Sequence, residues 1–171
     1  MKMSDYKVAE VPLRAGWLGI APLPGRTGFY ETDLSALLHW APNLVLTMTE
    51  SAELSYGDAD GFGADLAAAG VLWRHLPIVD MGPPPPDTEA LWSEASITAH
   101  DILEDGGRVF AHCFGGCGRA GMALLRLMVE AGEDVGPALE RLRAARPCAV
   151  ETDAQMKWAA IPMYERLGWT P

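Results

Sequence analysis

Apolar residues along the chain form short continuous runs, and these runs alternate with longer segments of helical periodicity. Short apolar runs bounded by Gly, Pro and Asp are typical of strands that are covered on both faces of a sheet. Helices are expected where an apolar stripe follows a capping residue and stops at Gly or Pro. The expected strands are residues 17–20, 44–48, 71–76 and 108–112. The expected helices run from Thr32 or Asp33 to Trp40 and over residues 60–69, 88–104, 120–131, 136–145 and 152–167.

Strands separated by helices indicate an α/β fold with a central, mainly parallel sheet of about four to five strands. The helices that follow the last expected strand should pack on one face of this sheet. A chain of 171 residues is large enough to bury its own core. We therefore expect a single domain over residues 1–171, in which about the first 15 residues form an N-terminal extension.

The charge balance narrows the classes of partner. The sequence has 13 Lys and Arg against 23 Asp and Glu, which gives a net charge of −10. Such acidity argues against phosphate backbones and anionic membrane surfaces, so we expect no nucleic-acid and no membrane partner. The N-terminal residues lack the apolar stretch of a signal peptide, and three cysteines are too few for a disulfide framework. These features predict a cytoplasmic protein.

The chemically informative segment is the glycine-rich loop 113–119, which lies between an expected strand and an expected helix. Its glycines let successive backbone N–H groups turn inward to form an anion-binding nest, and the helix adds its positive N-terminal end. The same surroundings favour the thiolate form of Cys113. Arg119 closes the loop with a planar guanidinium that can hold two phosphate oxygens. The expected phosphate-binding residues are Phe114, Gly115, Gly116, Cys117, Gly118 and Arg119.

The order His112, Cys113, five residues and Arg119 is a His-Cys-x5-Arg signature, and in it the sequence resembles the cysteine-dependent protein tyrosine phosphatases. Residues 18–26, 77–82 and 149–155 lie in the order of the dual-specificity type. They look most like the branch of cyclin-dependent kinase-associated phosphatase and its bacterial relatives. This resemblance spans about residues 17–167 and implies that family's fold and a phosphomonoester substrate.

Attack of a thiolate on phosphorus expels an oxygen leaving group, which needs an acid on a separate loop. Asp80 is the leading candidate because it follows an expected strand and opens a Pro-rich loop, and Asp87 is the reserve. The acid-before-Cys order matches the dual-specificity phosphatases. The resemblance also implies that Gln155 positions the water that hydrolyses the phosphocysteine. His112 is expected to support the loop through hydrogen bonds.

Two features leave alternatives open. Ala120 stands where the family usually has Ser or Thr, whose hydroxyl normally eases departure of the sulfur, so slow turnover is one possible outcome. Cys117 is either a resolving thiol that forms a reversible disulfide with Cys113 or a small loop residue without a task, and Cys148 is a further candidate partner for Cys113.

The sequence thus predicts a hydrolase of the tyrosine or dual-specificity protein phosphatase class, acting through a phosphocysteine intermediate. Its substrate would be a phosphorylated protein or a small phosphomonoester, and neither a cofactor nor a metal is expected. The oligomeric state is left open. The alternatives are a phosphate-binding pseudophosphatase with low turnover, suggested by Ala120, and a thiol enzyme of the rhodanese or arsenate-reductase kind, suggested by Cys117 and Cys148.

Overall fold

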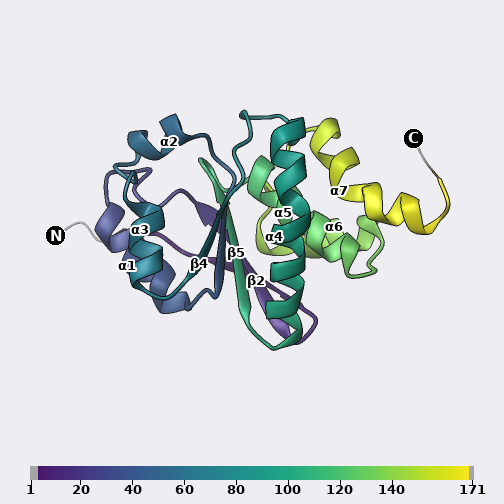
Figure 1. Cartoon of the computed structure of the whole chain (residues 1–171), viewed down its shortest axis with the longest axis horizontal. Coiled ribbons are helices and arrows are strands. Elements are labelled where there is room, and N and C mark those ends of the chain that lie inside the picture. Colours follow the sequence, from purple (N-terminus) through teal and green to yellow (C-terminus); the bar gives the residue numbers. More distant parts are fainter. Residues whose placement is uncertain (1–3, 170–171) are drawn as a thin grey trace.

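The computed structural model describes residues 4–169, and a five-stranded mixed sheet runs through its centre (Figure 1). The strand order is β1-β2-β5-β3-β4; β1 is antiparallel to β2, and the other neighbours are parallel. The expected α/β class and mainly parallel sheet are therefore confirmed. The strands are β1 (Ala9–Leu13), β2 (Gly16–Pro22), β3 (Leu44–Thr47), β4 (Leu72–His75) and β5 (Arg108–Cys113).

The first strand lies in the segment that was expected to be an N-terminal extension. In β1, Val11 and Leu13 are buried, whereas Glu10 and Pro12, which alternate with them, are exposed. A strand at the edge of a sheet tolerates proline, because one row of its backbone groups needs no partner. Two buried residues and one proline are too weak a pattern to predict a strand. The strand forms because its backbone pairs with β2 in antiparallel orientation.

Helices cover both faces of the sheet, with α1 to α3 on one side and α4 to α7 on the other (Figure 1). Successive residues of β5 therefore enter different cores: Phe110 packs with the α1–α3 side, and Val109 and Ala111 pack with the α4–α7 side. This two-sided burial explains why the strands read as continuous apolar runs. The helices are α1 (Tyr30–Trp40), α2 (Ser51–Tyr56), α3 (Phe62–Ala68), α4 (Pro86–Glu104), α5 (Gly118–Glu130), α6 (Val135–Ala145) and α7 (Asp153–Arg166).

The short helix α2 was not expected from the sequence. It has six residues, too few to show a 3.6-residue period, and it begins with a capping box formed by Glu50 and Glu53. The helix expected at 60–69 begins at Phe62, and the loop at 113–119 gives way to helix α5 already at Gly118. Within residues 4–169, no helix combines the length and the apolar character needed to cross a bilayer.

Candidate active site

Because β2, β5 and β3 are parallel neighbours, their carboxyl ends lie at one edge of the sheet, and the glycine-rich loop leaves β5 there. Cys113 is the last residue of β5 and is 3 % exposed. Gly116 has φ of 68°, and a Cβ at this position would lie 2.5 Å from the backbone of Ala21 and Pro22. The loop can thus pass close to the end of β2 only because residue 116 is glycine.

Arg119 is held in this loop by a carboxylate that the sequence did not reveal. Its two terminal nitrogens donate to the two carboxylate oxygens of Glu53, each at 2.7 Å, and Nη1 also donates to the carbonyl of Ile78 at 2.9 Å. Burial would lower the pKa of Arg119, but the hydrogen bonds that it donates to Glu53 and the charge of Cys113 raise this pKa. The guanidinium, 1 % exposed, is therefore a permanent and preoriented cation beside Cys113.

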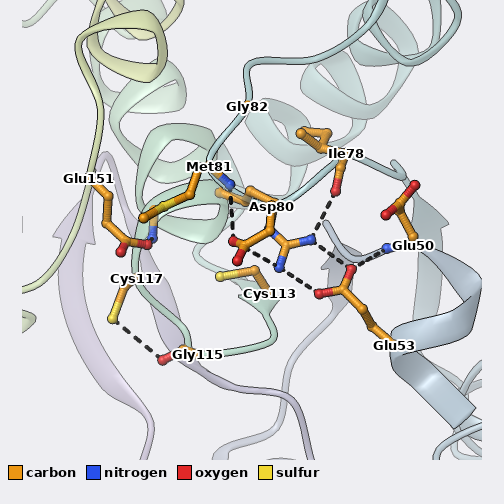
Figure 2. Close-up of polar contacts among 12 residues, drawn as sticks. Glu50, Glu53, Ile78, Asp80, Met81, Gly82, Cys113, Gly115, Cys117 and Glu151 are labelled. Atoms are coloured by element: carbon orange, nitrogen blue, oxygen red, sulfur yellow. Dashed lines mark hydrogen bonds and ion pairs between the residues drawn. The ribbon is translucent and has the colours of Figure 1, made fainter. Parts of the chain in front are cut away.

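Asp80 lies over Cys113 on the loop that follows β4 (Figure 2). Its Oδ1 is 3.4 Å from Nη2 of Arg119 and accepts a hydrogen bond from the backbone N of Met81 at 3.0 Å. Met81 adopts φ of 66°, which turns the chain back directly after the carboxylate. The side chain of Asp80 is 72 % exposed, so it faces both the loop and solvent. The reserve acid, Asp87, is an exposed residue in the first turn of α4.

His112 is fully buried behind the loop in a chain of hydrogen bonds. Trp73 Nε1 donates to Thr47 Oγ1 at 2.7 Å, and this oxygen lies 2.8 Å from His112 Nε2. The hydroxyl therefore donates to Nε2, and Nδ1 carries the hydrogen that points to the Cys113 carbonyl at 3.2 Å. Burial lowers the pKa of His112 to about 4, so the ring is neutral near neutral pH. These hydrogen bonds join His112 to β3 and to the backbone of Cys113.

The outer side of the loop is held by residues 146–151, which we call the clamp segment. Arg146 donates to the carbonyls of Gly115 and Gly116, both at 2.9 Å. The backbone N of Val150 donates to the carbonyl of Cys117 at 3.2 Å. These contacts, which come from the turn between α6 and α7, fix the path of the loop without covering Cys113.

A disulfide adds a covalent link between the loop and the clamp segment. It joins Cys117 to Cys148, whose Cα atoms are 5.1 Å apart, and it leaves Cys113 as a free, buried thiol. Neither Cys117 nor Cys148 is thus paired with Cys113, and Cys117 is not an idle loop residue. The sequence could not reveal this pair, because the two cysteines are 31 positions apart and the packing of the two intervening helices sets their separation in space.

Gln155 is buried beneath the loop in the first turn of α7. Its Oε1 accepts hydrogen bonds from the backbone N of Glu151 at 2.9 Å and of Thr152 at 3.2 Å, and Nε2 reaches the carbonyl of Gly82 at 3.4 Å. A Cβ at Gly118 would lie 2.9 Å from both amide atoms of Gln155. The structure thus brings Gln155 against the loop and also ties it to the Asp80 loop.

Two carboxylates at the site were missed from the sequence, and they approach the loop from opposite sides (Figure 2). Glu53 comes from α2, and Glu151 comes from the clamp segment, where its Oε1 accepts a hydrogen bond from the backbone N of Gly118 at 2.7 Å. A weak signal existed for each. Glu53 follows an expected strand that neighbours β5, and Glu151 belongs to the segment 149–155 that carries part of the family resemblance. Among residues 4–169, no group of three or more His, Cys, Asp or Glu is arranged to hold a metal ion.

Comparison with protein families gives one match that covers two thirds of the chain. Residues 21–133 match the family described as "Polymorphic toxin system, DSP-PTPase phosphatase". A search of the curated proteins gave no match.

Solved structures with the same fold are phosphatases. Kinase-associated phosphatase, in a form with its catalytic cysteine replaced by serine, has a TM-score of 0.82 at 18 % identity, over 99 % of this chain and 100 % of that one. Tk-PTP in its active form has a TM-score of 0.70 at 25 % identity, over 95 % and 99 % of the two chains. PTPMT1 in complex with PI(5)P has a TM-score of 0.72 at 17 % identity, over 94 % and 97 %. These likenesses extend over the whole sheet and both helical layers.

Proposed function

The chain belongs to the DSP-PTPase phosphatase family, and from this premise we propose that it hydrolyses phosphomonoesters through a phosphocysteine intermediate. The observation that carries the proposal is the grouping of Cys113, Arg119 and Asp80. A buried sulfur, a preoriented guanidinium and an exposed carboxylate meet at the end of β5. A nucleophile, an anion holder and an acid are the three groups that this reaction needs.

In the first step, the Cys113 thiolate attacks phosphorus, so that an S–P bond forms while the bond to the leaving oxygen breaks. Asp80 gives its proton to that oxygen and becomes a carboxylate. Arg119 and the N–H groups of the loop bind the remaining phosphate oxygens and stabilise the charge that they carry in the transition state. Because Glu53 already holds the guanidinium by both oxygens, Arg119 needs little reorganisation when a phosphate arrives.

In the second step, water attacks the phosphocysteine. Asp80 now accepts the proton of the water, the S–P bond breaks, and inorganic phosphate leaves with the Cys113 thiolate restored. We assign Gln155 to the positioning of this water, because its amide lies against Gly118 of the loop. No cofactor or metal takes part in either step of this scheme.

The substrates that we propose are phosphorylated proteins, as expected of a tyrosine or dual-specificity phosphatase, or small phosphomonoesters. Kinase-associated phosphatase is named for its association with a kinase, and the solved structure of PTPMT1 contains PI(5)P. These neighbours share the fold at under 25 % identity, so their ligands suggest a range of candidates rather than one. A panel of phosphotyrosine and phosphoserine peptides, an aryl phosphate and an inositide would distinguish them.

The proposal is tested by turnover of an aryl phosphate and an alkyl phosphate with purified wild-type protein and with the Cys113→Ser and Asp80→Asn variants. Cys113→Ser should abolish turnover, because the hydroxyl is not ionised near neutral pH. Asp80→Asn should cost about 10²- to 10⁴-fold with alkyl phosphates and less with aryl phosphates, whose leaving groups need less protonation. Retention of the wild-type rate by Cys113→Ser would overturn the mechanism, and equal losses on both substrates would reassign the acid.

A further inference from the structure

One amide of the candidate phosphate loop already binds an anion, and that anion belongs to the chain. Glu151 Oε1 accepts a hydrogen bond from the backbone N of Gly118 at 2.7 Å. Gly118 is the first residue of α5, where the helix N-terminus favours negative charge. Figure 2 shows Glu151 reaching in from the side of the loop opposite Glu53. A phosphate that uses this amide therefore competes with Glu151.

The position of Glu151 is built into the fold rather than being a chance surface contact. Its backbone N donates to Gln155 Oε1 at 2.9 Å, so the main chain is fixed beside the loop. A Cβ at Gly118 would lie 2.5 Å from Glu151 Oε1, so only glycine at residue 118 permits the contact. The disulfide between Cys117 and Cys148 ties the same two segments together. The Glu151 side chain can therefore rotate away from Gly118, whereas its main chain stays beside the loop.

The charges around the loop make it unfavourable for the Glu151 carboxylate to stay beside a bound phosphate. Arg119, the guanidinium beside Cys113, already faces two carboxylates of the protein, because it pairs with Glu53 and lies 3.4 Å from Asp80. Arg146 donates to the carbonyls of Gly115 and Gly116 on the outer side of the loop. A phosphate dianion that binds Arg119 beside Glu151 would therefore complete a cluster in which the negative charges of Glu53, Glu151 and the phosphate outnumber the single charge of Arg119. Like charges at such short range repel, and the repulsion is relieved by a nearby positive charge.

We propose that Glu151 is a specificity-determining residue that selects substrates with a cationic group beside the phosphate. On binding, a phosphate oxygen takes the Gly118 amide, and the displaced Glu151 carboxylate pairs with a Lys or Arg of a phosphopeptide. This inference rests on the proposed function and names a substrate class for it: basic phosphopeptides. The net charge of −10 acts in the same direction, because it attracts such peptides over longer distances.

The test measures binding by the Cys113→Ser protein, so that no turnover is needed. Two labelled phosphotyrosine peptides are compared by fluorescence anisotropy, one with lysines and one with glutamates on both sides of the phosphotyrosine. The Cys113→Ser protein should bind the lysine peptide more tightly, and adding Glu151→Gln should reduce the affinity ratio by about 3- to 5-fold, the size of an exposed ion pair. Glu151→Gln should also tighten the binding of the glutamate peptide, since it removes the competing charge.

The control variant is Glu104→Gln, which removes one negative charge from an exposed position at the far end of α4. It should leave the ratio close to that of the Cys113→Ser protein. Equal tightening of both peptides by Glu151→Gln, or an unchanged ratio, would overturn the proposal. Failure of the proposed function would appear in a separate assay, as the absence of aryl phosphate turnover by the wild-type protein. The ratio of the affinities for the lysine and glutamate peptides would still decide the role of Glu151.

Discussion

Among single residues, Glu53 holds the Arg119 guanidinium most directly. Burial would raise the pKa of Glu53, but its hydrogen bond with Arg119 and the backbone of Glu50 lower it, so the carboxylate stays ionised. Its two oxygens fix both terminal nitrogens of the guanidinium. The geometry of Arg119 is therefore set by a residue 66 positions away in sequence.

Glu53→Gln should lower kcat/KM for an aryl phosphate by about 10- to 100-fold, because a bidentate, charge-assisted contact is replaced by one neutral hydrogen bond. Steady-state kinetics with the wild-type protein, Glu53→Gln and Glu104→Gln would measure this. Glu104→Gln has the same change in charge and should behave like wild type. A Glu53→Gln protein with unchanged kcat/KM would mean that Arg119 does not need this partner.

Ala120 is a second residue whose effect can be isolated. It is fully buried in the first turn of α5, directly after Arg119. Ala120→Ser would add a hydroxyl of the kind that the family usually carries here, and one hydrogen bond to a charged sulfur is worth about 1.5–3 kcal/mol. Hydrolysis of the phosphocysteine should therefore accelerate by about 10-fold or more.

Rapid-mixing kinetics with an aryl phosphate would separate the two steps for Ala120→Ser. The burst, which reports Cys113 phosphorylation, should keep its rate, whereas the slower steady-state phase should speed up. An unchanged steady-state phase would mean that the absence of a hydroxyl at residue 120 does not limit turnover.

At the level of elements, the turn between α6 and α7 has two tasks. It connects two helices, and its clamp segment holds the loop between β5 and α5 by backbone hydrogen bonds and by the disulfide. Val150 adopts φ of 66°, which is unfavourable for a β-branched residue, so this turn is held by its contacts and not by local preference.

Reduction of the Cys117–Cys148 disulfide should lower the free energy of unfolding by about 2–4 kcal/mol, because the bond closes a long loop in the unfolded chain. Urea unfolding of the Cys113→Ser protein with and without reductant would measure this, since that background excludes exchange with Cys113. Adding Cys148→Ser should reproduce the reduced value and abolish the response to reductant. Equal unfolding midpoints in both redox states would contradict this expectation.

Across the whole molecule, His112 and Glu130 are two of the groups that couple stability to pH. Burial lowers the pKa of His112 to about 4, against 6.5 for a free side chain. Burial would raise the pKa of Glu130, but its hydrogen bonds, the largest from His100, lower it from 4.5 to about 2. His112 takes up a proton more readily in the unfolded chain, and Glu130 gives one up more readily in the folded chain.

The free energy of unfolding should therefore fall in two stages as the pH decreases. The contribution of His112 is lost between about pH 6.5 and 4, and that of Glu130 between about pH 4.5 and 2, each by up to about 3 kcal/mol. Urea unfolding at a series of pH values would show this. Glu130→Gln should shrink the lower stage, to which Glu53 also contributes, and leave the upper one. A single stage in wild type would contradict the assignment.

The sequence predicted the fold class, most of the strands and helices, and the residues of the loop from His112 to Arg119. It could do so because these features are local. Burial on both faces makes strands apolar without alternation, and a nest of amides needs its glycines at set places between one strand and one helix. The edge strand β1 and the short helix α2 were missed, because each depends on a neighbour rather than on a pattern of its own.

The partners of that loop came only from the packed structure. Glu53, Glu151 and the pairing of Cys117 with Cys148 join segments that are 31 to 66 residues apart in sequence. No periodicity or spacing encodes such contacts, because they depend on which strand ends meet at one edge of the sheet and on how α6 and α7 turn back. The residues of the loop are thus determined by the local sequence, whereas the charged groups that surround it are brought there by the tertiary fold.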